Sequence, residues 1–331
     1  MNNPSSASTI RHEEPSICLV AGYFGRLPTH FDCVLRSCEY NPSIQWVIVT
    51  DDTTPWDLPP NVRIHRATLP ELQKLFSHKL GFDVSLPRAY VLCDFRPAFG
   101  LLFSEIFSGF AFWGHCDLDV IFGDLRHFLG TEILNRHDRI LQRGHLSIYR
   151  NVDEVNRYFM RSAPGAMDYR EVFRDPVYRG FDEWKGIYRI LRYHGVPQYR
   201  EEIVADIASP TRYTYTRFEA TEFKNYPSQV FYWHRGKVFQ AHLNKEQGVE
   251  DREAAYIHFQ KRPMPKPDFD ARHAEGFLIT PDGFFPYALE HLTPEDFARY
   301  NRARRRPFRE IRTDFSDRVR RKLMCWMRRS T

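Results

Sequence analysis

The chain has 331 residues, of which 42% are hydrophobic and 27% are charged, and its formal net charge is +5. This length suffices for one large α/β domain or two small ones, and the composition is too polar for a protein embedded in lipid. No apolar run near the N-terminus could serve as a signal peptide, and no later segment approaches the length that spans a bilayer. We therefore expect a cytoplasmic protein in which residues 1–15 form a disordered leader.

The first part of the chain alternates strand and helix patterns, as an α/β domain does. The apolar run ICLVAG at 17–22 is followed by Gly and Pro, which predicts a parallel strand buried on both faces. Residues 88–109 have helical periodicity with a kink or new start at Pro97. Other elements expected here are helices at 30–38 and 69–80 and strands at 45–50, 62–65 and 110–113.

The pattern is less regular beyond residue 140. We expect helices at 152–161 and 183–194, a hairpin at 230–243 that turns at Arg235-Gly236, and a late strand at 254–259. No internal repeat and no flexible linker is evident between residues 17 and 290. The sequence therefore predicts one elaborated domain over 16–290.

The six cysteines form no Cys-x-x-Cys pair, and most lie in apolar runs where a reduced, buried thiol is usual. They indicate a reducing compartment. These residues are Cys18, Cys33, Cys38, Cys93, Cys116 and Cys325.

Basic residues are concentrated at the C-terminus. Residues 301–331 contain 12 Lys or Arg and 3 Asp or Glu, whereas the other 300 residues carry 35 basic and 39 acidic side chains. Apolar residues recur there at helical spacing, at Val319, Leu323, Trp326 and Met327, which predicts a basic amphipathic helical tail over 291–331. Such a helix would lie on an anionic membrane surface or form a solvated charged end, and nucleic acid is the less favoured partner.

An Asp-x-Asp motif follows an aromatic run at the centre of the chain. Asp117 and Asp119 are separated by one residue, so in extended structure both carboxylates project from the same side. A divalent cation relieves their repulsion, and oxygen ligands suit Mg²⁺ or Mn²⁺. The alternative is that the pair caps or turns the chain, as we expect for Asp124 before the next helix.

The order of these features resembles that of GT-A-fold glycosyltransferases. In that superfamily an opening strand, an acidic second strand end, an Asp-x-x-Arg-like element, an Asp-x-Asp and a late His follow one another. The blocks YFGRLP, LCDFRPAFG, FWGHCDLDVIFGDL and YIHFQKR are similar to the shared blocks of an uncharacterised bacterial family assigned to it. The resemblance covers about residues 17–262. It implies a GT-A-like nucleotide-diphospho-sugar transferase fold with a mixed, mostly parallel central sheet flanked by helices.

The resemblance also implies residue roles. Asp117 and Asp119 would hold Mn²⁺ or Mg²⁺ together with His258, and Lys261 would neutralise the pyrophosphate. The implied nucleotide-sugar contacts are Gly22, Tyr23, Phe24, Asp51, Asp94 and Arg96. Each has a structural alternative, since Tyr23 and Phe24 suit a core, His258 suits a half-buried strand, and Asp94 with Arg96 suits a surface pair.

The implied activity is transfer of a sugar from a nucleotide-diphosphate donor to a glycan or lipid-linked acceptor in cell-surface polysaccharide synthesis. The enzyme would be cytoplasmic, and peripheral on the inner face of the membrane if the tail binds lipid. An inverting reaction needs a carboxylate base, for which Asp182 and Glu183 in GFDEW are candidates; their alternative role is helix capping.

The donor class and the stereochemistry stay open. The Asp-to-Arg spacing is tighter than in the better-known retaining enzymes, and no Gly-Gly precedes the Asp-x-Asp. A metal-dependent phosphoesterase or nucleotidyltransferase is the alternative function. The sequence has neither G-x-G-x-x-G nor G-x-x-x-x-G-K-[ST], which argues against dinucleotide and P-loop sites.

Overall fold

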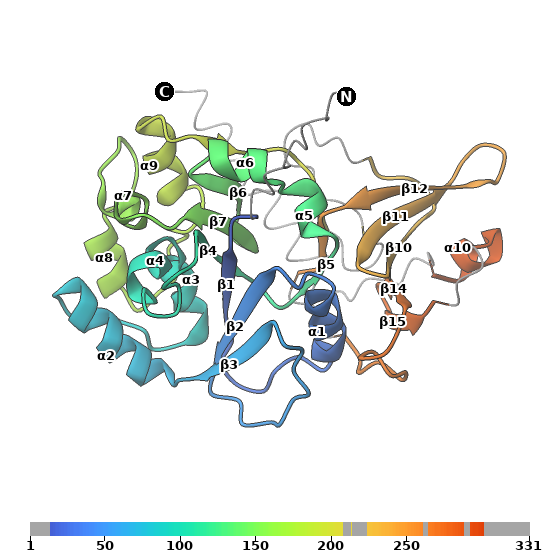
Figure 1. Ribbon diagram of the computed structural model, residues 1–331, viewed down its shortest axis with the longest axis horizontal. Coiled ribbons are helices and arrows are strands. Elements are labelled where there is room, and N and C mark those ends of the chain that lie inside the picture. The colour runs from blue at the N-terminus through green and yellow to red at the C-terminus, as the bar shows by residue number, and fades with distance from the viewer. Residues whose placement is uncertain (1–13, 208–212, 214–223, 261–263, 288–291, 301–331) are drawn as a thin grey trace, which may run out of the picture.

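The computed structural model describes residues 14–207, 213, 224–260, 264–287 and 292–300 (Figure 1). Three expectations concern residues that lie wholly or mostly outside these ranges: the leader over 1–15, the role of Lys261, and the basic tail over 291–331, of which residues 14–15 and 292–300 are described.

A seven-stranded sheet forms the centre of the molecule, with the strand order β3-β2-β1-β4-β7-β6-β8 (Figure 1). Its strands are β1 (Ile17–Gly22), β2 (Ile44–Thr50), β3 (Val62–Arg66), β4 (Phe112–Cys116), β6 (Arg139–Arg143), β7 (Leu146–Arg150) and β8 (Gln198–Tyr199). The first four are parallel, β7 is antiparallel to both β4 and β6, and β8 is parallel to β6. The expected α/β class with a mixed, mostly parallel central sheet is confirmed.

Strand β1 is apolar throughout because both faces of the sheet are covered. Ile17 and Leu19 belong to one core cluster and Cys18 and Val20 to another, as the alternation of side chains along a strand requires. Helix α1 (Phe31–Glu39) packs in the first cluster, and α2 (Leu69–Leu80) packs in the second. Figure 1 shows the two helices on opposite sides of β1–β3.

The remaining helices are short. They are α3 (Leu92–Phe95), α4 (Phe99–Leu102), α5 (Leu125–Phe128), α6 (Thr131–Arg136), α7 (Asp153–Asn156), α8 (Tyr169–Arg174), α9 (Ile187–Tyr193) and α10 (Pro294–Tyr300). Turns of 3₁₀ helix at Ala89–Val91, Arg96–Ala98 and Tyr158–Met160 join some of them. No helix of the described segments is both long and apolar enough to cross a membrane.

Two further sheets complete the fold. A five-stranded antiparallel sheet, ordered β12-β11-β10-β14-β15, consists of β10 (Gln229–His234), β11 (Lys237–Leu243), β12 (Val249–Ala254), β14 (Gly276–Thr280) and β15 (Gly283–Pro286). A three-stranded sheet joins β5 (Val120–Phe122), β13 (Tyr256–His258) and β9 (Ala205–Asp206). Trp233 packs in the same cluster as Leu19, and its indole N–H donates to the Phe122 carbonyl at 3.1 Å.

Several expected boundaries differ from the structure. The strand expected at 110–113 instead starts at Phe112, where pairing with Ile17 begins, and extends to Cys116. The helical stretch expected over 88–109 runs only from Ala89 to Leu102, and the expected break at Pro97 is the 3₁₀ turn between α3 and α4. The helix expected over 152–161 is α7 followed by a 3₁₀ turn. The expected hairpin at 230–243 and the N-cap at Asp124, which accepts the His127 N–H at 3.0 Å, are confirmed.

The run expected as one strand at 254–259 divides at Ala255. Strand β12 ends at Ala254 in the five-stranded sheet, and β13 starts at Tyr256 in the three-stranded one. The Ala255 N–H donates to the Ile203 carbonyl at 2.8 Å. The chain therefore changes sheets just before His258.

The cysteines of the described residues form no disulfide. Four of them, Cys18, Cys33, Cys38 and Cys116, are buried, as their apolar surroundings predict, and Cys93 is partly exposed.

Candidate functional site

The carboxyl ends of β1, β2 and β4 lie at one edge of the central sheet because these strands are parallel. Ligands of open α/β sheets gather at such an edge. A pocket of about 670 Å³ opens there. Its walls include Gly22, Tyr23, Arg26, His30, Tyr90, Arg96, Asp117 and Asp119.

The loop after β1 is held in the pocket wall by the two acids that follow β2. Asp51 accepts the Gly25 N–H at 2.7 Å, and Asp52 accepts the Leu27 N–H at 2.7 Å. The hydrogen bonds from Leu27 and then Thr54 lower the pKa of Asp52 to about 2. Asp51 thus supports the loop and does not itself line the pocket, in contrast to the contact that the resemblance implies.

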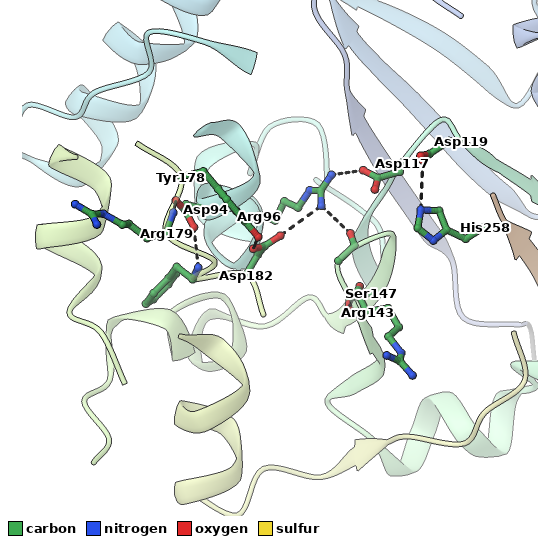
Figure 2. Close-up of polar contacts among 12 residues, drawn as sticks. Asp94, Arg96, Asp117, Asp119, Arg143, Ser147, Tyr178, Arg179, Asp182 and His258 are labelled. Carbon is green, nitrogen blue, oxygen red and sulfur yellow. Dashed lines mark hydrogen bonds and ion pairs between the residues drawn. The ribbon is translucent and has the colours of Figure 1, made fainter. Parts of the chain in front are cut away.

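Asp117 and Asp119 line this pocket and form a cluster with His258 (Figure 2). One ligand atom from each lies within 4.8 Å of the others, and His258 Nε2 is 3.6 Å from Asp119 Oδ1. The pairing of β13 with β5 sets His258 opposite Val120, one residue after Asp119. Residues far apart in the chain thereby reach the same site.

The donor set fits a divalent cation. It offers two carboxylates and one imidazole. Mn²⁺ accepts both kinds of ligand, and the carboxylates also suit Mg²⁺. Within the described part of the chain, Asp119 Oδ2 is enclosed and accepts no hydrogen bond. A buried carboxylate oxygen without a partner is costly unless a cation or another donor satisfies it.

Asp206 lies behind His258 and was not expected from the sequence. Its Oδ1 is 2.9 Å from His258 Nδ1, and the ring of His145 stacks on that of His258 with centroids 4.1 Å apart. Burial disfavours the imidazolium, yet the hydrogen bonds to Asp119 and Asp206 raise the pKa of His258 to about 9. The two carboxylates thus favour the imidazolium form of His258, whereas a metal bound at Nε2 would require that nitrogen to be deprotonated.

Arg96 joins the pocket to a buried acid. Its guanidinium pairs with Asp117, donates to the Gly144 carbonyl at 2.9 Å, and lies 3.4 Å from Asp182 (Figure 2). Tyr178 donates its hydroxyl to Asp182 at 3.0 Å. Burial raises the pKa of Asp182 to about 7, although the Arg96 charge acts in the opposite direction.

Asp182 and Glu183 therefore have different surroundings. Asp182 is buried behind Arg96 and lines neither pocket described for this chain. Glu183 is exposed and lines a second, smaller pocket. Only Glu183 of the two expected bases reaches a cavity.

Asp94 is placed differently from the role implied for it. The side chain is fully buried, and its carboxylate accepts the Arg179 N–H at 2.6 Å and the Phe181 N–H at 2.7 Å (Figure 2). It anchors the loop before Glu183 and does not line the nucleotide-side pocket. A helical turn directs Asp94 and Arg96 to opposite sides, so they do not act as one element.

The structure thus brings five of the expected residues to the first pocket, namely Gly22, Tyr23, Arg96, Asp117 and Asp119. His258 contacts this group from the side of the second pocket. Phe24 packs against the core cluster instead, which was its structural alternative.

Sequence reasoning missed several residues of these cavities, including Tyr90, His145, Trp184 and Asp206. The only local signal was the apolar segment IVADI before and around Asp206, which is typical of a strand that ends on an acid. The others have no motif and are found only from their positions in space.

Comparison with known proteins gives one family match. A family model described as "Family of unknown function (DUF6625)" matches residues 19–288. No curated protein matches the chain. The matched segment extends from β1 past β15 and includes every residue of the carboxylate and histidine cluster. The chain therefore belongs to the DUF6625 family, a family of unknown function.

Proposed function

We propose that this chain is a metal-dependent glycosyltransferase with a GT-A-like fold that uses a nucleotide-diphosphate sugar as donor. The observation that carries the proposal is the Asp117–Asp119–His258 cluster, whose two aspartates line a large pocket at the carboxyl ends of parallel strands. The strand order with one antiparallel member beside β4 supports it, as do the sequence blocks that contain these residues.

The larger pocket suits the nucleotide part of such a donor. Its volume of about 670 Å³ lies within the roughly 300–1,000 Å³ of common ligand sites. Tyr23 and Tyr90 supply aromatic surface for a base, and Arg96 supplies a charge beside Asp117. Acids alone would repel a diphosphate, so a cation on Asp117 and Asp119 and the guanidinium of Arg96 both serve its binding.

In the proposed reaction an acceptor hydroxyl oxygen bonds to the anomeric carbon of the donor sugar. The bond from that carbon to the diphosphate oxygen breaks, and the nucleoside diphosphate leaves with the electron pair. A divalent cation held by Asp117, Asp119 and His258 would neutralise the growing charge on that leaving group. In an inverting reaction Glu183 would take the hydroxyl proton, because it is the candidate base that faces a cavity.

The test is a thermal-shift panel of UDP, GDP, CMP and dTDP derivatives with and without Mn²⁺. A ligand that binds only the folded state raises Tm. We expect one nucleotide to do so only when Mn²⁺ is present, because the proposed cation is needed to bind its diphosphate. Asp119→Asn should abolish this shift by removing one ligand charge. Asp83→Asn, at an exposed position away from the pocket, should preserve it.

A second measurement separates glycosyl transfer from the alternative phosphate chemistry. Incubation with the nucleotide sugar that binds and with an acceptor extract should yield a glycosylated product and free nucleoside diphosphate. Cleavage of a phosphate ester without sugar transfer would instead indicate a phosphoesterase or nucleotidyltransferase. Equal nucleotide affinity in wild type and Asp119→Asn would exclude the proposed site.

A further inference from the structure

A second pocket, of about 220 Å³, meets the first at the contact between Asp119 and His258. His258 and Asp206 line the second pocket, whereas Asp117 and Asp119 line the first. The candidate metal site is therefore the partition between two cavities. A group bound in the second one would face the reacting centre from the side opposite the nucleotide.

The walls of the second pocket combine planar polar side chains with aromatic rings. The polar members include Gln142, Arg143, Glu183, Glu202 and Gln260, and the aromatic members are Trp184 and Tyr188. Arg143 and Glu202 pair at 2.9 Å, so these two neutralise each other. The amides of Gln142 and Gln260 can donate and accept hydrogen bonds, and the carboxylate of Glu183 can accept them, which suits a ligand rich in neutral hydroxyl groups.

Gln142 lines this pocket and carries an amide oxygen without a partner among the described residues. This atom, Oε1, is enclosed. The pairing of β6 with β7 shifts register between Ile140 and Arg143, and Leu141 adopts a φ of 63°. Bulges redirect side chains beside binding sites, and a left-handed leucine is costly. The strained bulge thus directs Gln142 and Arg143 into the cavity.

Trp184 provides a flat apolar surface at the same pocket. Its side chain is 44% exposed, although large apolar residues are usually buried. The helix expected from residue 183 starts only at Ile187, because Gly186 leaves the helical conformation and the Ile187 N–H bonds to the Phe181 carbonyl at 2.8 Å. This turn keeps Trp184 outside the core, with its ring 4.4 Å from that of Tyr188.

We propose that the second pocket binds a sugar ring of the acceptor, with Trp184 as the platform for the apolar face of the ring. Gln142 and its polar neighbours would bind the hydroxyl groups, and Glu183 lies in the same wall. The cavity is smaller than the roughly 300–1,000 Å³ of sites for larger ligands, so it suits a single ring better than a nucleoside diphosphate. The inference rests on the proposed function and narrows the acceptor class to saccharides.

The test uses the full-length protein with Mn²⁺ on an array of immobilised neutral and acidic oligosaccharides, followed by calorimetry with the best binder. Trp184→Ala should weaken saccharide binding at least about tenfold, because it removes the aromatic contact surface. Trp184→Phe should keep affinity within about threefold, since a ring remains. Tyr193→Ala removes a more exposed aromatic ring, at 64%, that lines neither pocket and is the matched control.

The outcomes separate this inference from the proposed function. If Mn²⁺-dependent nucleotide binding needs Asp119 but no saccharide binds, or Trp184→Ala binds saccharide as wild type does, the acceptor assignment is wrong and the donor site stands. Loss of nucleotide binding in Trp184→Ala would show that the Trp184 ring contacts the nucleobase and not a sugar, and would overturn the inference. If saccharide binding needs Trp184 but no nucleotide raises Tm in a Mn²⁺-dependent way, the pocket is a saccharide-binding site and the proposed glycosyltransferase function is wrong.

Discussion

Asp206 determines which nitrogen of His258 faces the carboxylate pair. Its Oδ1 is 2.9 Å from Nδ1, so a proton on Nδ1 is held there and Nε2 is directed towards Asp119. Metal-binding histidines commonly have such an outer carboxylate, which fixes the ring orientation and raises its basicity. Asp206 is in this sense a positioning residue for the candidate site.

Removing this carboxylate should weaken metal binding. We expect Asp206→Ala to lower Mn²⁺ affinity by about 10- to 100-fold, which is the usual effect of losing a carboxylate that orients a metal-binding histidine. The Mn²⁺ affinity of Asp206→Asn should lie between those of Asp206→Ala and wild type. Calorimetric titration with Mn²⁺ in the absence of nucleotide measures this directly. Asp138→Asn breaks an ion pair with Arg150 outside both pocket walls and should leave Mn²⁺ affinity unchanged. An unchanged affinity in Asp206→Ala would refute the orienting role.

Asp52 should give the fold a measurable dependence on acid pH. Its side chain is only 9% exposed, and hydrogen bonds from Leu27 and Thr54 lower its pKa from 3.8 to about 2. The stabilisation is complete above the unfolded pKa and is lost as the pH falls from about 4 towards 2. Asp52→Asn should therefore cost about 2 kcal/mol at pH 7, with a difference from wild type that shrinks in this acid window.

Urea denaturation at pH 7, 5, 4 and 3 measures that difference in the free energy of unfolding. Asp83→Asn, at an exposed position, serves as the control. A cost for Asp52→Asn that is the same at every pH would mean that the carboxylate charge does not stabilise the loop.

Strand β4 can place Asp117 and Asp119 at the pocket only because Gly114 lets its neighbours approach closely. A Cβ at Gly114 would lie 2.6 Å from the Leu19 side chain and 2.6 Å from the Ser147 carbonyl oxygen. The Leu19 contact is with the end of a side chain, but the Ser147 carbonyl belongs to the backbone and cannot withdraw without disturbing the pairing of β4 with β7. The strand is thus fixed on the side of β7 two residues before it ends.

Gly114→Ala should destabilise the protein by about 2 kcal/mol through this overpacking. At Gly130 an added Cβ meets nothing within 4 Å, so Gly130→Ala should cost about 0.5 kcal/mol, as expected for a substitution at a helix N-cap. Chemical denaturation of both variants provides the comparison. Equal free energies of unfolding of the two variants would show that Leu19 and Ser147 can move to accommodate a Cβ at position 114.

At the scale of the whole molecule, two of the three sheets meet at the candidate site. The central sheet supplies Asp117 after β4, the three-stranded sheet supplies His258 and Asp206, and the turn between β6 and β7 supplies His145. The change of sheet at Ala255 is what carries the late part of the chain back to this point. Two cavities on either side of one cluster result from this junction.

Local patterns were sufficient for the class of the fold and for the acidic pair. Apolar runs with turn residues predicted β1 and β2 closely, because a strand buried on both faces must be apolar throughout. Asp117 and Asp119 were identified from their Asp-x-Asp spacing after an apolar strand, although the structure places them in the bend between β4 and β5 and not in extended structure. These properties depend only on residues close in sequence.

The rest was decided by contacts between distant parts of the chain. Asp206 and His258 are 52 residues apart and Tyr256 and His145 are 111 apart, and no sequence pattern links them. Asp94 looked like part of a ligand site, yet the backbone donors of the 179–181 loop surround it. Sequence alone determined which groups are available for chemistry, whereas the packing of the sheets decided which of them are buried as supports and which face a cavity.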